Sequence, residues 1–428
     1  MNVLLIGGGG REHALAWKLK QSLRLNALFI APGNAGTLTL GENVALDLDD
    51  FDAIRKFTLS KSINLVIVGP EAMLIQGLAD FFAEDKELQH VLFFGPQKRG
   101  AMLEGSKDWA KQFMQRHNIP TARSRTFTRN TLGEGIEFLK EKSGPYVLKA
   151  DGLAAGKGVL IAEDKQGAIE ALTDMLENQK FGEASAKVVI EDYLAGTELS
   201  VFVITDGIHY KLLPEAKDYK RIGEGDTGLN TGGMGAISPV PFADDFFMKK
   251  VEQQIIKPTI QGLQTENIPY CGFIFFGLIN VEGNPHVIEY NARMGDPEAE
   301  VVIPRIEEDL LLLMQTAAEK NLSNTPVRTS DNHAASVMMV SGGYPERYEK
   351  GKIIQGLEEI ADSLVFHAGT KAEANLVKTS GGRVLAVTSL KPTMETALNA
   401  AYSDCQKVYF ENSYYRTDLG EDLKKYQQ

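Results

Sequence analysis

The sequence predicts a multidomain protein of the α/β and α+β classes, and three observations lead to this expectation. The chain has 428 residues, whereas one hydrophobic core rarely serves more than about 250 to 300 residues. In the first hundred residues, short apolar runs alternate with helical patterns, and each run ends in Gly or Pro. That alternation is typical of a parallel sheet covered by helices on both faces. The remaining chain has a different, glycine-rich pattern, so further domains are expected.

Residues 1–102 are expected to form the N-terminal parallel-sheet domain. Its predicted strands are residues 2–6, 27–31, 64–68 and 91–94. Gly7–Gly10 follow the first strand, but their spacing does not match a dinucleotide-binding fingerprint. The second strand also does not end in the Asp or Glu that such a site needs to bind the ribose. Glycines at a helix N-terminus do let backbone N–H groups approach an anion. Phosphate binding and a simple tight turn are therefore both open at Gly7–Gly10.

Two further domains are expected, at residues 103–325 and 326–428. In the first, strands are predicted at 146–150, 158–162, 187–192, 198–205, 273–281 and 286–291, with helices at 165–178 and from 306. Residues 121–192 should form a lid subdomain, and residues 216–241 a loop-rich stretch. In the last domain, strands at 335–340 and 381–390 and a helix near 392–409 predict a small α+β unit.

The glycine-rich stretch Lys149–Val159 lies between two predicted strands. It is not a Walker A motif, because three residues rather than four precede Gly156-Lys157, and Gly158 follows the lysine. A hairpin tip of this composition could fold over phosphates with its N–H groups inward. Lys149 could neutralise a phosphate oxygen, although a flexible hairpin without function has the same pattern.

Two strand ends carry polar side chains that suit a nucleotide. Beyond the apolar strand 188–190, a hinge could pair with an adenine edge, and Glu198 could hold a ribose diol. On the strand 286–291, Glu289 and Asn291 are two residues apart and therefore share a face. Magnesium accepts one or two such protein oxygens together with phosphate oxygens. Solvated polar strand ends are the simpler alternative in both places.

The segment Asn230–Ala236, NTGGMGA, is too rich in glycine for a regular element, and we expect an exposed loop. The charged cluster 217–221 lies just upstream of it. Taken together, the two segments suggest contact with a small polar substrate. A solvated surface is the alternative for the charged cluster.

Composition excludes several classes of protein. Hydrophobic residues make up 43% and charged residues 24%, which is ordinary for a globular protein. The 57 acids against 45 bases, a net charge of −12, argue against sequence-independent nucleic-acid binding. The two cysteines, Cys271 and Cys405, have no CxxC spacing and fit a reducing cytoplasm. No apolar run is long enough to span a bilayer, so a soluble cytoplasmic protein without a membrane partner is expected.

From Gly9 to Gly420, the chain resembles the glycinamide ribonucleotide synthetase family of the ATP-grasp superfamily. The motifs that carry the resemblance are Gly9–Ala14, Ala31–Gly36, Val68–Glu71, Leu103–Lys107, Lys149–Val159, Asn230–Ala236, Glu289–Pro297, Phe366–Thr370 and Arg416–Gly420. Most ATP-grasp motifs indicate only the superfamily. Lys149–Val159 and Asn230–Ala236 are much more specific for the synthetase family.

The resemblance implies a Rossmann-like pre-ATP-grasp domain, an ATP-grasp core with a mobile lid, and a small C-terminal domain. It also implies an ATP-dependent C–N ligase of de novo purine biosynthesis, acting at its second step. Glycine and 5-phosphoribosylamine would give glycinamide ribonucleotide, ADP and phosphate through glycyl phosphate. Mg²⁺ or Mn²⁺ is the implied metal and a monomer the implied state.

The site residues come from the same resemblance. ATP binding is implied for Lys107, Lys149, Gly152, Gly156, Lys157, Gly158, Glu191, Leu194 and Glu198. Metal binding is implied for Glu289 and Asn291, and catalysis for Arg293, Lys217 and Asp218. Substrate binding is implied for Gly9, Asn34, Glu71, Gly232, Gly233, Met234 and Asp296.

The chain departs from the family pattern at Gly8, Tyr219, Leu229, Ala299 and Glu300, where the family usually has Asn or Ser, His, Pro, Thr and Gln. None of these positions is an implied phosphate or metal ligand, so the departures concern local substrate contacts. The alternatives are an ATP-grasp carboxylate–amine ligase with another acceptor, a biotin-carboxylase-like enzyme, and a nucleotide-binding module without catalysis.

Overall fold

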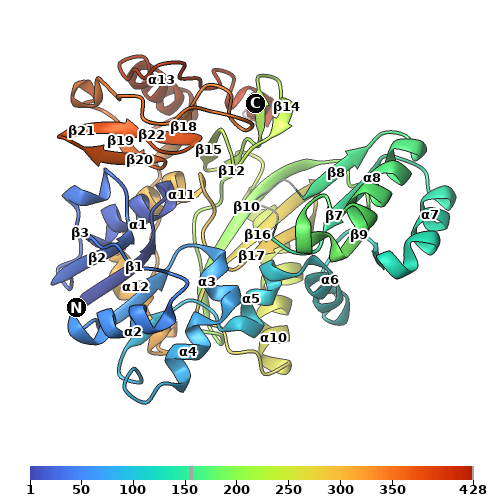
Figure 1. Cartoon of the computed structure of the whole chain (residues 1–428), viewed down its shortest axis with the longest axis horizontal. Coiled ribbons are helices and arrows are strands. Elements are labelled where there is room, and N and C mark those ends of the chain that lie inside the picture. Colours follow the sequence, from blue (N-terminus) through green and yellow to red (C-terminus); the bar gives the residue numbers. More distant parts are fainter. Residues whose placement is uncertain (154–157, 427–428) are drawn as a thin grey trace.

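The computed structural model describes residues 1–153 and 158–426, and its elements form four groups: N-terminal, central, lid and C-terminal (Figure 1). The N-terminal group contains a parallel sheet of order β3-β2-β1-β4-β5. Its strands are β1 (Asn2–Gly7), β2 (Ala27–Pro32), β3 (Glu42–Asn43), β4 (Leu65–Val68) and β5 (Leu92–Phe94). Its helices are α1 (Gly10–Leu19), α2 (Phe51–Ser60), α3 (Glu71–Gln76) and α4 (Leu78–Glu84). The predicted parallel sheet is confirmed.

In this sheet, β2 and β3 lie on one side of β1, and β4 and β5 lie on its other side. The order of the strands therefore reverses at β1. Ligands of open α/β sheets bind beyond the carboxyl ends of the strands at such a reversal of strand order. The segments there are Gly7–Gly10 after β1, Gly33–Gly36 after β2 and Gly69–Glu71 after β4. The topology therefore brings together three of the glycine-containing segments singled out in the sequence.

The central group is built on an antiparallel sheet of order β11-β10-β16-β17. Its strands are β10 (Thr197–Thr205), β11 (Tyr210–Leu212), β16 (Gly272–Val281) and β17 (Asn284–Asn291). The helices around it are α5 (Lys98–Gly105), α6 (Lys107–Arg116), α9 (Asp245–Val251), α10 (Lys257–Thr265), α11 (Ala299–Arg305) and α12 (Leu310–Ala318). The helix expected from Ile306 is present but starts later, at Leu310, and a separate helix, α11, precedes it. The chain leaves the helical conformation at Ile306, which pairs with Thr329, and starts a new helix capped by Asp309.

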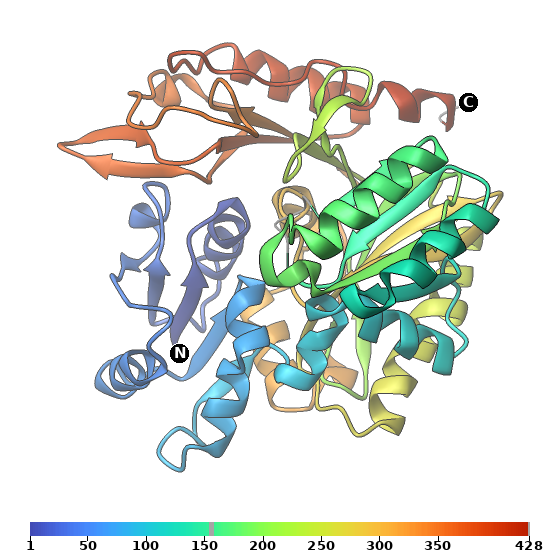
Figure 2. The same cartoon turned by 45° about the vertical axis from the view of Figure 1, so that its right-hand side comes forward.

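The lid subdomain has its own antiparallel sheet, of order β6-β9-β7-β8. Its elements are β6 (Ser124–Thr128), α7 (Leu132–Glu141), β7 (Tyr146–Ala150), β8 (Val159–Ala162), α8 (Lys165–Glu177) and β9 (Lys187–Asp192). Leu148, Ile190 and Leu172 belong to a separate buried cluster between this sheet and its two helices. The lid therefore has a small core of its own and stands out from the body in Figures 1 and 2.

The C-terminal group is a sheet of order β12-β15-β18-β22-β19. Its strands are β12 (Lys217–Asp218), β15 (Gly235–Ser238), β18 (His333–Val340), β19 (Leu364–His367) and β22 (Arg383–Lys391), and α13 (Met394–Cys405) packs on it. Two ribbons, β13 (Arg221–Gly223) with β14 (Thr227–Asn230) and β20 (Thr370–Glu373) with β21 (Leu376–Thr379), lie beside it.

The expectation of a loop throughout Asn230–Ala236 is wrong at both ends. Asn230 ends β14, and Gly235 starts β15, whose four residues are buried. β15 pairs with β18, about a hundred residues further along the chain. A glycine-rich segment can be a strand when two neighbouring strands supply its hydrogen bonds, and that pairing is invisible in the local sequence.

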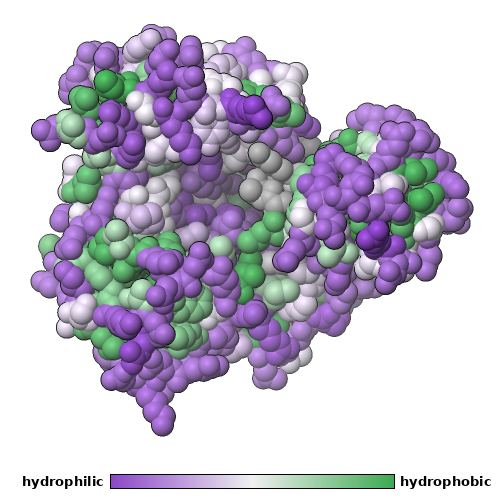
Figure 3. Space-filling model, in the orientation of Figure 1, coloured by the Kyte–Doolittle hydropathy of each residue, from purple (hydrophilic) through white to green (hydrophobic). Residues whose placement is uncertain are grey.

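The N-terminal, C-terminal and lid groups surround a hollow in the surface whose rim is largely hydrophilic (Figure 3). Within the described residues, no helix is both long enough and apolar enough to cross a membrane.

Candidate active site

The three loops beyond the parallel sheet are held by their own side chains. Asn34 is buried, and its amide donates to the carbonyls of Gly8 (3.0 Å) and His367 (2.6 Å). Its amide oxygen accepts the backbone N–H of Gly36 at 2.9 Å. Gly9 caps α1, and its N–H donates to Glu12 at 2.7 Å. The Asn34 amide therefore shapes the loops and links them to the C-terminal sheet.

Arg293 is fixed between two parts of the molecule. Its Nε donates to Glu71 (3.2 Å), its Nη2 to Glu104 (2.7 Å) and its Nη1 to the Met294 carbonyl (3.1 Å). Burial opposes the ionisation of Glu71, but Arg293 and Arg11 outweigh it and hold the pKa of Glu71 below its usual value. For Glu104, which is 8% exposed, burial raises the pKa in spite of Arg293. Glu71 and Arg293, which sequence reasoning gave separate roles, form one ion pair.

Asp296 and the loop at Gly232 are joined by Arg383 of β22. Its Nη1 donates to the carbonyls of Gly232 (2.5 Å) and Asp296 (2.7 Å), and its Nη2 lies 2.9 Å from the Asp296 carboxylate. The Gly232 N–H donates to the hydroxyl of Tyr344 at 3.0 Å. A Cβ placed on Gly9 would lie 3.3 Å from the Asp296 carboxylate. Three predicted substrate residues, Gly9, Gly232 and Asp296, thus lie close together.

Two of the lysines predicted to bind ATP lie where the lid meets the central group. Lys107 opens α6, and Lys149 lies on β7 with a side chain that is 5% exposed. Burial lowers the pKa of Lys107. Lys149 donates to the Ile288 carbonyl of β17 (3.2 Å) and lies 3.0 Å from Glu191. Glu191 is on β9, and the register β7–β9 puts its side chain on the same face of the lid sheet as Lys149.

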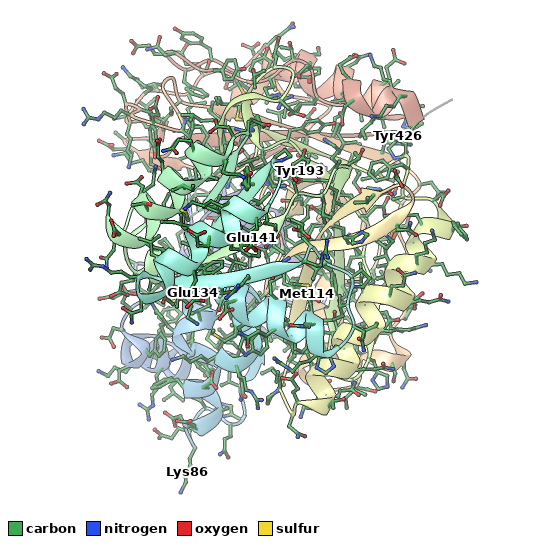
Figure 4. All side chains as sticks on the ribbon, turned by 90° about the vertical axis from the view of Figure 1, so that its right-hand side faces the viewer. Lys86, Met114, Glu134, Glu141, Tyr193 and Tyr426 are labelled. Atoms are coloured by element: carbon green, nitrogen blue, oxygen red, sulfur yellow. The ribbon has the colours of Figure 1, made fainter. Side chains whose placement is uncertain are left out.

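The hinge after β9 borders a cavity of about 580 Å³. Glu191, Tyr193 and Leu194 contribute to its lining, and Thr121 and Tyr146 lie across from them. Figure 4, which looks onto the lid, labels Tyr193 and Glu141 on the lid and Met114 of α6 below. Tyr193 is 47% exposed. The hinge therefore offers an aromatic side chain and an apolar one at the edge of an open cavity.

Lys217 and Asp218 point to opposite sides of β12. Asp218 pairs with Lys220 (3.0 Å), which also pairs with Glu198 at 2.9 Å. Lys220 is the largest influence that holds the pKa of Glu198 below its usual value. The ammonium of Lys217 instead lies 3.1 Å from Asp422 and 3.9 Å from the ring centroid of Tyr219. Asp218 is thus joined to the predicted ribose ligand, whereas Lys217 is paired with the C-terminal segment.

Glu289 and Asn291 are adjacent on one face of β17, as the strand period predicts, and both are half-buried. In the described parts of the chain, neither side chain forms a hydrogen bond or ion pair. The charge of Glu289 partly offsets the burial that lowers the pKa of Lys107, and it adds to the effect of Asp218 and Glu198, which raise the pKa of Lys220. A carboxylate and an amide oxygen without protein partners fit a divalent cation that also binds phosphate oxygens. No group of three or more His, Cys, Asp or Glu side chains across 1–153 and 158–426 could hold a metal alone.

Four further predicted binding residues are three glycines and Met234. Gly152 packs against Ala184, Gly158 is buried, and Gly233 has a positive φ of 117° that favours glycine. Met234 is fully buried in the interior, so only its backbone is available to a substrate. Gly156 and Lys157 lie outside the described residues.

The departures from the family pattern lie in different environments. Tyr219 is 2% exposed, and its hydroxyl donates to Asp422 (2.8 Å) and accepts the N–H of Gly420 (2.9 Å). Tyr219 therefore anchors the C-terminal segment. Leu229 is 51% exposed, and Ala299 is fully buried. Glu300 is buried beside Gly10, neither carboxylate oxygen has a hydrogen-bond partner in the described chain, and burial raises its pKa well above the usual value.

Sequence reasoning missed four residues that hold this site together: Glu104, Lys111, Tyr344 and Arg383. Glu104 precedes Lys107 within a quoted motif, and Lys111 lies one helical turn after Lys107. The spacing of four residues puts Lys107 and Lys111 on one helix face and could have marked Lys111. Tyr344 and Arg383 reach the site from the C-terminal sheet, and no local signal marks them.

Sequence models of the phosphoribosylglycinamide synthetase family match the chain in three parts. The N domain matches residues 1–104, the ATP-grasp (A) domain residues 105–299 and the C domain residues 334–422.

Individual relatives cover nearly the whole chain. A phosphoribosylamine–glycine ligase of Escherichia coli (strain K12) is 44% identical over 426 residues, which are 98% of each chain. The crystal structure of a phosphoribosylamine–glycine ligase from Thermotoga maritima has a TM-score of 0.85 at 35% identity, covering 98% of this chain and 100% of the other. A biotin carboxylase from Campylobacter jejuni has a TM-score of 0.72 at 14% identity, covering 100% and 95%, and shares the fold.

Proposed function

The chain belongs to the phosphoribosylglycinamide synthetase family and is an ATP-dependent ligase that joins glycine to phosphoribosylamine in purine biosynthesis, and from this we propose a role for each side chain around the hollow. We place the nucleotide between the lid and the central sheet. The observation that carries this placement is the hydrogen bond from Lys149 of the lid to the carbonyl of Ile288 on β17 (3.2 Å), the residue next to Glu289. Lysine ammonium groups near a carboxylate that has no protein partner in the described chain suit a triphosphate bound to a metal ion.

In the proposed arrangement, Lys107 and Lys149 bind phosphate oxygens, and Glu198 holds the ribose. Within residues 1–153 and 158–426, Lys149 uses two of its three N–H groups, on Glu191 and Ile288, so one remains for a phosphate. The adenine lies at the hinge, with its edge toward the backbone near Leu194. Its amino group donates to Oε1 of Glu191, a buried oxygen that has no hydrogen-bond partner among the described residues. Gly152 and Gly158 flank the phosphates, and the same role is proposed for Gly156 and Lys157.

The proposed metal site consists of Glu289, Asn291 and nucleotide oxygens. A bound Mg²⁺ or Mn²⁺ would neutralise phosphate charge as the γ-phosphoryl group is transferred. Glu289 supplies the negative charge and Asn291 a neutral oxygen, and the strand keeps both on one face. Glu289 is partly exposed, so its carboxylate can reach a ligand without first leaving the core.

The chemistry proceeds in two steps. An oxygen of the glycine carboxylate attacks the γ-phosphorus, the bond to the β-phosphate oxygen breaks, and ADP leaves. The amine of phosphoribosylamine then attacks the carbonyl carbon of glycyl phosphate, phosphate leaves, and the amine gives up a proton. Alignment and charge neutralisation are the main requirements of both steps. We assign neutralisation of the acyl phosphate to Arg293. Asp218 acts through its ion pair with Lys220, and Lys217 has a supporting role through Asp422.

Phosphoribosylamine lies, in this proposal, beyond the carboxyl ends of β1, β2 and β4. Gly9 presents backbone there, Asn34 shapes the loop, and Glu71 holds Arg293. Gly232, Gly233 and the backbone of Met234 face glycine, together with Asp296. Domain boundaries near 102 and 325, a cytoplasmic location and a monomeric state complete the proposal. Free thiols at Cys271 and Cys405 support the cytoplasmic location.

The direct test is ADP release by the purified full-length chain with ATP, Mg²⁺, glycine and freshly prepared phosphoribosylamine. We expect ADP release to depend on both glycine and phosphoribosylamine, with glycinamide ribonucleotide formed in equal amount. ADP release no higher than in the glycine-free control would contradict the ligase assignment. Tight ATP binding without any acceptor-dependent turnover would instead favour a binding module.

Arg383 gives a second prediction, because it ties the Gly232 loop to Asp296. Replacing Arg383 by Met removes two hydrogen bonds and an ion pair, and we expect KM for glycine to rise by about 10-fold or more. KM for ATP should change less than threefold, because the partners of Arg383 in the described chain, Gly232 and Asp296, are not among the residues proposed to bind ATP. Arg347→Met, on an exposed side chain of the same domain, is the matched control. An unchanged KM for glycine would show that the Gly232 loop does not contact glycine.

A further inference from the structure

Glu191 is paired with two lysines rather than one. Its side chain is 5% exposed, and its Oε2 lies 3.0 Å from the ammonium of Lys149 and 3.2 Å from that of Lys111. Its other oxygen, Oε1, is buried and has no hydrogen-bond partner within the described chain. The lysines come from different parts of the molecule, Lys149 from the lid strand β7 and Lys111 from the body helix α6.

The two lysines differ in what else they bind. Lys111 donates to the Thr121 hydroxyl at 2.7 Å and to the Ala122 carbonyl at 3.3 Å, in addition to its ion pair with Glu191. A lysine ammonium has three N–H groups, so all three of Lys111 have protein partners. Among the described residues, Lys149 has two partners, which leaves one of its N–H groups without a protein acceptor there. Lys111 is therefore not available to a phosphate, whereas Lys149 is.

Lys111 is also tied to the central sheet. The Thr121 hydroxyl, which accepts from Lys111, itself donates to the Val287 carbonyl of β17 at 2.7 Å. The chain β17–Thr121–Lys111–Glu191 thus connects the strand that carries Glu289 with the hinge strand β9. Burial lowers the pKa of Lys111 to about 8, although Glu191 acts to raise it. Burying an ammonium group at this position costs free energy, and a lysine on the surface would not have this cost.

We infer that Lys111 is a positioning residue for nucleotide selection: it holds the Glu191 carboxylate in place, with Oε1 toward the purine 6-position, while Lys149 turns to the phosphates. This inference rests on the placement of adenine at the hinge proposed above. An ionised carboxylate only accepts hydrogen bonds. It therefore attracts the 6-amino group of adenine and repels the 6-oxo group of guanine. Without Lys111, Glu191 would lose its remaining counter-charge when Lys149 binds phosphate.

The test compares Lys111→Met with the native enzyme, using ATP and GTP as probes. We expect KM for ATP to rise by about 10-fold or more, because a buried carboxylate loses a charged partner. At saturating ATP, kcat should stay within about twofold, and KM for glycine should not change. The ratio of kcat/KM for ATP to that for GTP should fall by about 10-fold or more. Lys111→Gln removes the charge but keeps polar contacts with Thr121, and it carries the same test if Lys111→Met does not fold.

Lys187→Met is the matched control. Lys187 of β9 pairs with Asp108 of α6 at 3.1 Å and so also joins the lid to α6, but its side chain is 46% exposed. We expect native KM values and native nucleotide selectivity in Lys187→Met. The same losses in this control would mean that lid docking, not Glu191, causes the effect, and would overturn the inference.

Glu191→Gln separates this inference from the proposed hinge site. If Glu191→Gln weakens ATP binding and selectivity but the Lys111 variants only lower Tm, the hinge site stands and the role of Lys111 is overturned. If Glu191→Gln itself leaves KM for ATP and the ATP-to-GTP ratio unchanged, the placement of adenine at this hinge is wrong. Parallel losses in Glu191→Gln and Lys111→Met, with a native control, support both.

Discussion

Replacing Glu289 by Gln is expected to lower kcat/KM for ATP by at least about 100-fold at limiting magnesium, since removing one metal ligand removes several kcal/mol of charge stabilisation. The substitution keeps the size of the side chain and removes only its charge. Glu289 forms no hydrogen bond or ion pair in the described chain, so the fold loses no contact, and Tm should remain within a few degrees of the native value. Turnover measured against magnesium concentration checks the prediction.

The magnesium dependence separates a metal ligand from a general electrostatic effect. If Glu289 binds the metal, raising magnesium should restore part of the activity of Glu289→Gln, because weaker binding is offset by mass action. Glu282→Gln, in the exposed turn at the other end of the β16–β17 pair, is the matched control and should retain native turnover. Native magnesium dependence in Glu289→Gln would contradict the metal assignment.

Local patterns predicted much of the fold. The strand period placed Glu289 and Asn291 on one face, and the alternation of apolar runs with helices identified the parallel sheet whose loops carry Gly9, Asn34 and Glu71. These features depend on residues that are neighbours in the chain, or on topology that follows from βαβ connections. A single sequence contains such information directly.

The parts that could not be predicted depend on contacts between distant segments. Gly235–Ser238 forms a strand because β18 pairs with it. Lys217 pairs with Asp422, more than two hundred residues later, which separates it from the neighbouring Asp218. Arg383 reaches Gly232 from the C-terminal sheet. In each case, the residue type allowed several partners, and only the packed structure selects one.

The family motifs named the site residues but not their partners. Arg293 and Glu71 belong to different motifs and were predicted to bind different substrates. In the structure they form an ion pair, and Arg293 also pairs with Glu104. This pair connects the N-terminal sheet with the residue assigned to the acyl phosphate. If phosphoribosylamine binds beside Glu71 as proposed, its binding can affect the orientation of Arg293 directly.

Replacing Arg293 by Lys is expected to lower kcat by at least about 100-fold, the loss typical of removing one donor from a group that stabilises transition-state charge. The guanidinium has five N–H groups, and three are bound to Glu71, Glu104 and the Met294 carbonyl. Those three bonds fix its plane and leave two N–H groups for an acyl phosphate. An ammonium has no such fork and cannot bind both carboxylates and a phosphate in the same geometry.

The measured quantities are kcat, KM for each substrate and Tm. We expect KM for ATP to stay within about threefold, because the nucleotide contacts other lysines, while kcat falls. Arg116→Lys is the matched control, since Arg116 also uses its fork on a carboxylate, both oxygens of Glu266 at 2.8 and 3.1 Å, but on the surface. That variant should retain native kcat. If Arg293→Lys lowers only Tm and keeps native kcat, Arg293 merely joins the domains, and the acyl phosphate must be neutralised by other groups.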